Sequence, residues 1–196
     1  MYEVSEEDLK RTEDLCYNTL LPRRMLHCLS CGEVLYRLHP SIGKANARVL
    51  ALLHDIAHHY TREQLLSIID KEHLVLEKGE RELTVLLHAP VGAFIARTMI
   101  PSLPNEFVNA IRRHTVPHPD MNSVSYALFV ADIIEPTRPF ITDSERQKIY
   151  DMQSDKKRIL YSIRCQEKYL KSTGGKQLDC TLALVKKLEE EVRSAL

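Results

Sequence analysis

The sequence predicts an all-α protein, and three of its features support that prediction. Apolar residues recur at helical spacing along most of the 196 residues, and two segments begin with side chains typical of helix N-termini. Strand signals are nearly absent, since there is no Asn-Gly hairpin turn and no sustained alternation of apolar and polar residues. With 44% apolar residues, the chain can bury one sizeable core, which favours a single domain over residues 1–196.

Capping side chains and proline mark where the first helices begin. Ser5-x-x-Asp8 and Thr61-x-x-Gln64 are typical of helix N-termini, where a side-chain oxygen accepts a hydrogen bond from a free backbone N–H group. Pro22 suits the first turn of another helix. Two dipeptides are expected to separate helices, His39-Pro40 and Gly174-Gly175. Further helices are expected over 44–59, 62–71, 81–99, 104–114, 121–134, 143–171 and 178–195.

Composition argues against several classes of protein. Twenty-seven Lys and Arg balance twenty-seven Asp and Glu, so no basic surface for a nucleic-acid duplex is expected. The longest apolar runs, 49–53 and 126–131, are far shorter than the roughly 20 residues of a membrane span. The acidic N-terminus lacks the apolar segment of a signal peptide, so we expect a cytoplasmic protein without membrane contact.

The five cysteines are expected to be free thiols, because their number is odd and no export signal precedes them. Cys28-x-x-Cys31 is the one closely spaced pair. It lies in a helical pattern with no second cysteine pair and no preceding strand, so neither a zinc site nor a redox motif is favoured.

An ionisable pair, His54-Asp55, interrupts an otherwise apolar helical segment, 49–57. Burying such a pair costs several kcal/mol unless another group compensates it. A metal ion would do so, because imidazole nitrogen and carboxylate oxygen are both donors to first-row metals. Adjacent residues on a helix point about 100° apart, so both can reach one centre from the rim of a pocket.

Isolated ionisable residues recur on the neighbouring helices. A single histidine on an apolar helix face is more often a hydrogen-bonded core residue than a ligand. Together with His54-Asp55, however, the isolated residues make five buried ionisable sites, each of which would need its own compensating partner in one small core. One shared metal centre would satisfy them all. The additional residues are His27, His88, His114 and Asp132.

The order His27, His54-Asp55, Asp132 resembles the HD superfamily of metal-dependent phosphohydrolases, which is all-helical. Four segments, LALLHDIA, LLHAPVGA, AIRRHTV and FVADIIEPTR, are similar in order and spacing to YqeK-type bacterial hydrolases of symmetrical dinucleoside tetraphosphates. The resemblance covers about residues 20–140. It implies a helical HD core there, with a C-terminal helical extension over about 143–196.

The resemblance also implies a ligand set and a reaction. A first metal would be held by His27, His54, Asp55 and Asp132. A second would be held by His88 and His114, with Asp55 bridging the two ions. Four histidines and two carboxylates suit iron, manganese or zinc better than magnesium, and the family is associated with iron. The reaction implied is hydrolysis of diadenosine tetraphosphate to two ADP by metal-activated water.

A polyphosphate substrate needs further hydrogen-bond donors. Arg24 lies three residues before His27 and shares its helix face, so it is expected to contact a phosphate. Arg138 and the Thr115 hydroxyl are the other expected substrate contacts. Arg112 and Arg113 are expected to face outward.

Three residues depart from the pattern of the family. His58 stands where relatives usually have a lysine, Pro117 replaces a glycine, and Tyr126 replaces a second lysine. His58 is expected to contact substrate or to donate a proton, a role that would require the protonated ring. We therefore assign catalysis to Asp55 and His58. An exposed histidine pair, His58-His59, at a helix end is the alternative.

These departures leave other functions open. The altered residues favour, as alternatives, a phosphohydrolase of another nucleotide or a metal-holding nucleotide-binding module with weak catalysis. Oxygenase chemistry at a similar di-iron site is disfavoured by Arg24 and Arg138. The C-terminal region is expected either to complete the pocket or to form the surface of a homodimer.

Overall fold

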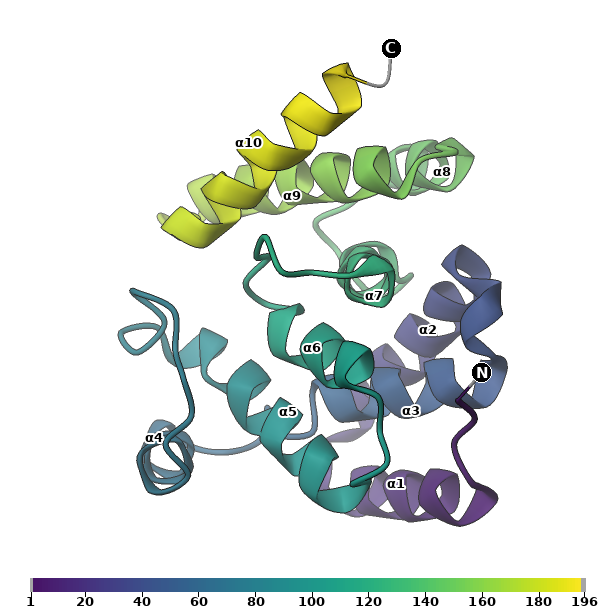
Figure 1. Ribbon diagram of the computed structural model, residues 1–196, viewed down its shortest axis with the longest axis vertical. Coiled ribbons are helices and arrows are strands. Elements are labelled where there is room, and N and C mark those ends of the chain that lie inside the picture. The colour runs from purple at the N-terminus through teal and green to yellow at the C-terminus, as the bar shows by residue number, and fades with distance from the viewer. Residues whose placement is uncertain (1, 195–196) are drawn as a thin grey trace.

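The computed structural model describes residues 2–194, and all regular structure in that range is helical (Figure 1). The predicted all-α class is confirmed. The α-helices are α1 (Glu6–Thr19), α2 (Pro22–Leu38), α3 (Lys44–His54), α4 (Arg62–Lys71), α5 (His88–Met99), α6 (Asn105–Arg113), α7 (Ser123–Ile134), α8 (Asp143–Asp151), α9 (Asp155–Ser172) and α10 (Asp179–Arg193), with short 3-10 turns at Pro40–Ile42 and Thr84–Leu86.

Helix α7 lies at the centre of the packing. It contacts α2 and α6 on one side and α9 on the other, so that α8, α9 and α10 form a layer across it (Figure 1). Helices α2 and α3 pack against each other, as do α5 and α6. Most of α7 is buried, including Asp132. An ionisable residue on such a helix requires a partner inside the protein.

One large apolar core extends from Val4 to Leu188 and includes residues of the C-terminal helices. A smaller cluster packs α4 against the start of α5 through Leu65, Ile69, Leu87 and Val91. The division into an HD core and a C-terminal extension stays a prediction. None of the described helices combines the length and the apolar character that crossing a membrane requires.

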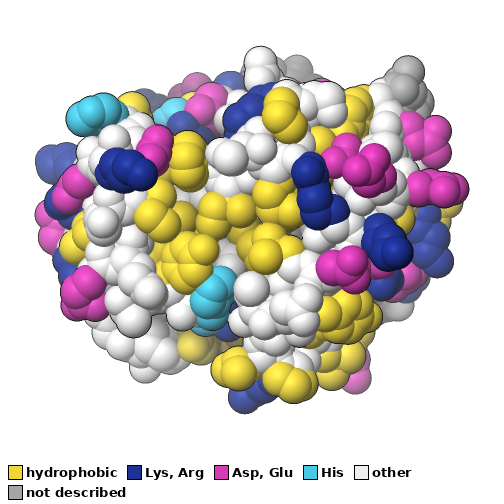
Figure 2. Space-filling view, turned by 90° about the horizontal axis from the view of Figure 1, so that it is seen from below, with side chains coloured by type: hydrophobic (Ala, Val, Ile, Leu, Met, Phe, Trp, Pro, Cys, Tyr) yellow, Lys and Arg dark blue, Asp and Glu magenta, His cyan; other side chains and the backbone are white. Residues whose placement is uncertain are grey.

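The face of the molecule below α1 in Figure 1 carries apolar side chains across its middle (Figure 2). Lysine, arginine, aspartate and glutamate are interspersed around its margins (Figure 2).

The predicted helix starts are confirmed where capping chemistry determines them. The Ser5 hydroxyl accepts the Asp8 N–H at 3.0 Å. Thr61 and Gln64 form a reciprocal capping box at the start of α4. Pro22 is the first residue of α2, a position where its missing N–H costs no intrahelical hydrogen bond.

Two predicted helices are longer than the observed ones. The segment expected over 44–59 is helical only to His54, since Asp55 leaves the helical conformation and a series of turns follows. The helix expected over 81–99 begins at His88. Pro90 explains this start, because a proline ring clashes with the carbonyl four residues before it and is tolerated only in a first turn.

The helix expected over 143–171 is two helices, α8 and α9, separated by residues 152–154. Ser154 caps α9 by accepting the Lys157 N–H, and serine followed by Asp155 is a strong N-terminal signal. The helices expected over 104–114, 121–134 and 178–195 agree with α6, α7 and α10 to within two residues, and residue 195 lies outside the described residues.

Candidate metal centre

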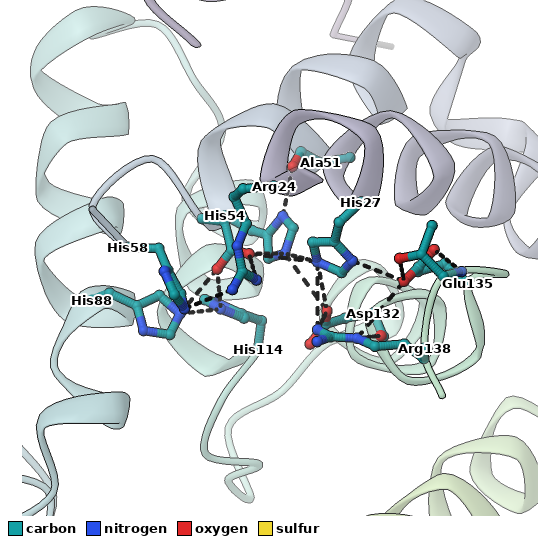
Figure 3. A network of polar contacts seen from close by, with 12 residues as sticks. Arg24, His27, Ala51, His54, His58, His88, His114, Asp132, Glu135 and Arg138 are labelled. Carbon is teal, nitrogen blue, oxygen red and sulfur yellow. Dashed lines mark hydrogen bonds and ion pairs between the residues drawn. The ribbon is translucent and has the colours of Figure 1, made fainter. Parts of the chain in front are cut away.

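Six imidazole and carboxylate groups, separated by up to about 105 positions in the chain, converge on one buried point (Figure 3). They come from five helical segments, and all six are buried. These are the six side chains predicted as ligands: His27 on α2, His54 and Asp55 at the end of α3, His88 at the start of α5, His114 after α6, and Asp132 on α7. Their assignment as ligands stays a prediction.

The first group of donors lies around the Oδ2 atom of Asp55. The Nε2 atoms of His27 and His54 are 3.4 and 3.5 Å from it and 3.3 Å from each other. Asp132 Oδ1 lies 3.1 Å from His27 Nε2 and 3.7 Å from His54 Nε2. One cation could therefore contact two imidazoles and two carboxylates here.

The second group lies around the other oxygen of Asp55. Its Oδ1 atom is 3.1 Å from His88 Nε2 and 3.8 Å from His114 Nε2, and the two ring nitrogens are 2.9 Å apart. Asp55 is thus the one side chain shared by both groups. This is the arrangement expected of a carboxylate that bridges two ions.

Hydrogen bonds at the far side of the rings fix which nitrogen faces the centre. The Nδ1–H of His54 donates to the Ala51 carbonyl at 2.5 Å, and that of His114 donates to the Ile111 carbonyl at 2.7 Å. His27 Nδ1–H donates to the fully buried Glu135 at 2.9 Å. Such outer contacts commonly orient histidines that bind metals.

These contacts turn the Nε2 atoms of His27 and His54 toward the two carboxylates of the centre. The raised pKa of His27 means that its Nε2–H donates to Asp132 Oδ1, 3.1 Å away, while no ion is bound. With an ion bound, the same Nε2 atom would lose its proton and present a lone pair to the metal. His54 Nε2 lies 3.3 Å from His27 Nε2, 3.5 Å from Asp55 Oδ2 and 3.7 Å from Asp132 Oδ1. Imidazole nitrogens and carboxylate oxygens that converge on one buried point are a donor set that fits a first-row metal.

The electrostatics of the buried groups favour the same conclusion. Burial opposes ionisation of Asp55, but His54, His114 and His88 hold its pKa well below the usual range. Burial likewise opposes a positive charge on His27, yet hydrogen bonds with Asp132 and Glu135 raise its pKa to about 9. The carboxylates therefore remain anionic and draw positive charge to this position.

A cleft of about 420 Å³ opens beside the centre. Its lining combines basic side chains with two leucines and a proline. The predicted substrate residues Arg24, His58 and Arg138 all lie on it. The complete lining is Leu20, Leu21, Arg23, Arg24, His27, His58, His59, Thr137, Arg138 and Pro139.

The two arginines bridge the cleft and the centre. Arg24 donates to Asp55 Oδ2 at 2.6 Å and approaches His58 Nε2 at 2.8 Å. Arg138 donates to the Asp132 carboxylate and, at 2.7 Å, to the Asp132 carbonyl. Each guanidinium has five N–H donors, so further donors remain for a ligand in the cleft.

His58 is exposed on one side, and its ring packs against His88 with centroids 5.1 Å apart. Loss of water around the ring lowers its pKa to about 4, with Arg24 adding to the effect against the attraction of Asp55. The ring is therefore neutral at pH 7, and it accepts a hydrogen bond from Arg24. The expected role as a cation does not suit this environment.

Other predicted residues lie away from the cleft. Thr115 lines a different cavity, beside Leu86 and Leu170. Pro117 is buried and its carbonyl accepts a hydrogen bond from Thr181. Tyr126 stands where relatives usually have a lysine. It lines a small cavity between α7 and α9 and does not line the cleft, so this departure does not alter the cleft.

Arg112 and Arg113 do not face outward, contrary to expectation. Both are largely buried in ion pairs with Glu80 and Glu77, because those acids lie on a segment that folds back over α6. Glu135, which orients His27, was not among the predicted site residues. Its spacing of three residues from Asp132 on one helix was the available signal.

The model of the HD domain family matches residues 24–137, more than half of the chain. The chain belongs to the HD domain family. HD domains bind divalent metal ions, and this chain is an HD-domain phosphohydrolase.

Similar proteins include a symmetrical bis(5'-nucleosyl)-tetraphosphatase of Bacillus subtilis, 30% identical over 66% of this chain and 70% of the relative. A protein of the same name from Halalkalibacterium halodurans is 31% identical over 62% of this chain and 65% of its own length. A solved Clostridium acetobutylicum structure, described as a predicted HD superfamily hydrolase involved in NAD metabolism, aligns with a TM-score of 0.82 at 27% identity, covering 93% of this chain and 97% of its own.

Replacing Asp55 with Ala should abolish binding of both metal ions, because Asp55 is the side chain common to the two donor groups. Elemental analysis after dialysis against Mn²⁺ measures the metal content directly. His88→Ala is the matched control, since it leaves the first group intact and should retain one ion. Full metal content in Asp55→Ala would contradict the shared-ligand geometry.

The depressed pKa of His58 predicts a pH dependence of stability. Its pKa is about 4 in the folded protein and about 6.5 in an unfolded chain, so the unfolded state binds more protons between these values. Stability should therefore rise with pH from 4 to 6.5 and should rise less in His58→Gln. Urea denaturation at several pH values tests this, and an unchanged slope in the variant would count against a neutral His58.

Proposed function

We propose that the protein hydrolyses dinucleoside tetraphosphates symmetrically, converting diadenosine tetraphosphate and water to two ADP. The observation that carries this proposal is the pair of donor groups sharing Asp55 beside a basic cleft. The names of the Bacillus and Halalkalibacterium relatives support the same substrate. In the reaction, water adds to one of the two central phosphorus atoms and the bond to the central bridging oxygen breaks. The released oxygen takes up the proton.

The residues that would hold one ion are His27, His54, Asp55 and Asp132, and those for a second are Asp55, His88 and His114. Bound divalent ions supply Lewis acidity, which polarises phosphoryl oxygens and increases the acidity of water. Four imidazoles make a nitrogen-rich set that favours first-row transition metals over magnesium. We expect iron, with manganese or zinc as alternatives.

Arg24, Arg138 and His58 have different proposed roles. Arg24 and Arg138 lie at the junction of the cleft and the centre, where their free N–H groups can bind phosphate oxygens of the substrate. His58, being neutral, holds Arg24 in place by accepting its hydrogen bond. We therefore assign His58 to catalysis as a positioning residue rather than as a phosphate-binding cation.

The apolar part of the cleft lining suits the nucleoside. Leu20, Leu21 and Pro139 present apolar surface, and Leu21 is 74% exposed although it is a large hydrophobic residue. The flat face of a base would cover such surface and remove it from water. One cleft thus combines apolar and cationic side chains, the two kinds of contact that a nucleotide needs.

Product analysis tests the proposed function. Metal-loaded protein with diadenosine tetraphosphate should release ADP alone, resolved by anion-exchange chromatography, and Asp55→Ala provides the background rate. Equal amounts of AMP and ATP, or no turnover by protein that holds its metal, would contradict the proposal. Because His58 replaces a lysine usual in relatives, a panel of other nucleotides run in parallel identifies a changed substrate preference.

Replacing Arg24 with Ala should lower kcat/KM about 10- to 100-fold, the effect of losing a hydrogen bond between charged groups in a partly buried site. Metal content should not change, since Arg24 is not among the proposed ligands. Arg37→Ala is the control, because this arginine lies on the same helix but packs over the Tyr150 ring. Simultaneous loss of metal would show that Arg24 supports the centre instead.

A further inference from the structure

The connection between α4 and α5 contains a carboxylate that the proposed chemistry does not use. This connector, residues 72–87, has no α-helix, and it ends where His88 begins α5. Glu80 lies in its middle, and its side chain is fully buried. A buried carboxylate on an irregular segment needs an explanation, because its removal from water is unfavourable.

Arg112 of α6 pairs with this carboxylate through two hydrogen bonds. Its Nη1 and Nη2 atoms lie 2.8 and 2.6 Å from Glu80 Oε1 and Oε2. Arg112 also donates to the Val75 carbonyl at 3.2 Å, and the Glu77 N–H donates to Glu80 at 2.6 Å. The pair therefore fixes the connector at several points with the directional geometry of a bidentate contact.

A second ion pair lies directly beside the first. Arg113 donates to Glu77 at 2.7 Å and to Asp120 at 2.6 Å, so it joins the connector to the loop that follows α6. Asp120 also contacts His118 Nδ1 at 2.8 Å. The two arginines thus bind segments on both sides of the last turn of α6.

Stability alone is a weak reason for such an arrangement. A buried ion pair often contributes no more than well-packed apolar residues would, whereas it fixes one geometry strictly. The geometry that it fixes here is specific: Arg112 and Arg113 immediately precede His114, and the connector leads into His88. The network therefore joins the two segments that carry the second group of donors.

We infer that Glu80 and Arg112 are positioning residues for the second metal position, holding His88 and His114 at the separation needed to share one cation. This inference rests on the proposed two-metal site. The first group of donors, on α2, α3 and α7, makes none of these contacts. Disturbing the pair should therefore weaken one metal position and leave the other intact.

The connector itself provides a matched control. Arg81 forms an equally short bidentate pair with Asp70, at 2.8 and 2.8 Å, but both side chains are at least half exposed. It joins the connector to α4 and not to α6. Asp70→Asn therefore removes a connector ion pair without touching the contact to the segment that carries His114.

The test is Mn²⁺ binding by equilibrium dialysis and elemental analysis of the full chain. Wild type and Asp70→Asn should bind two ions per chain. Glu80→Gln should bind one ion at limiting Mn²⁺, matching His88→Ala, and recover the second at about 10- to 100-fold higher Mn²⁺, the range typical of lost outer-shell contacts. Recovery of activity with the second ion should follow the same curve in Glu80→Gln and should not occur in His88→Ala.

Arg112→Lys keeps the charge but loses the bidentate contact, so it decides the question if Glu80→Gln does not fold. Unchanged binding of both ions in either folded variant, or loss of both ions in the two variants, would overturn the positioning role. A wild type that binds one ion would also overturn it. By contrast, two-ion binding without hydrolysis of dinucleoside tetraphosphates would remove only the proposed function.

Discussion

The constraint on which this structure depends is the burial of the Asp55 carboxylate among imidazole rings in the core. Its two oxygens lie between four imidazole nitrogens, and the side chain is 3% exposed. Burying an ionised carboxylate without compensation costs several kcal/mol. Arg24, Arg138 and the raised pKa of His27 supply part of the compensating positive charge. A bound cation would supply further positive charge there. The buried imidazole and carboxylate groups would then serve as its ligands.

Two of the histidines at the centre lie at the C-terminal ends of helices. His54 ends α3 and His114 follows α6, and each donates from Nδ1 to the carbonyl three residues before it. Carbonyls in a last helical turn lack intrahelical donors, so fixing both rings in this way also satisfies backbone groups that would otherwise be unpaired. The negative ends of both helix dipoles point to the same centre and favour a cation there. Glu135 serves His27 in the place of such a carbonyl.

The sequence predicted the residue types at the centre better than the supporting structure around it. An ionisable group on an apolar helix is visible in a single segment, which is why the members of the central cluster could be identified before their convergence was known. The side chains whose surroundings were predicted wrongly make contacts with distant segments of the chain. Arg112 was expected to face outward because its partner, Glu80, lies 32 positions away on an irregular connector. The late start of α5 was predictable from Pro90, whereas the division of α8 from α9 rests on the weaker signal of Ser154.

Anomalous X-ray scattering from crystals of the metal-loaded protein tests the central claim most directly. Data collected at the absorption edge of the bound metal should give two peaks, one on each side of the Asp55 carboxylate. One peak should lie within coordination distance of His27 and the other within coordination distance of His88. Peaks elsewhere, or an ion-free centre whose histidines bond only to one another and to main-chain oxygens, would contradict the account.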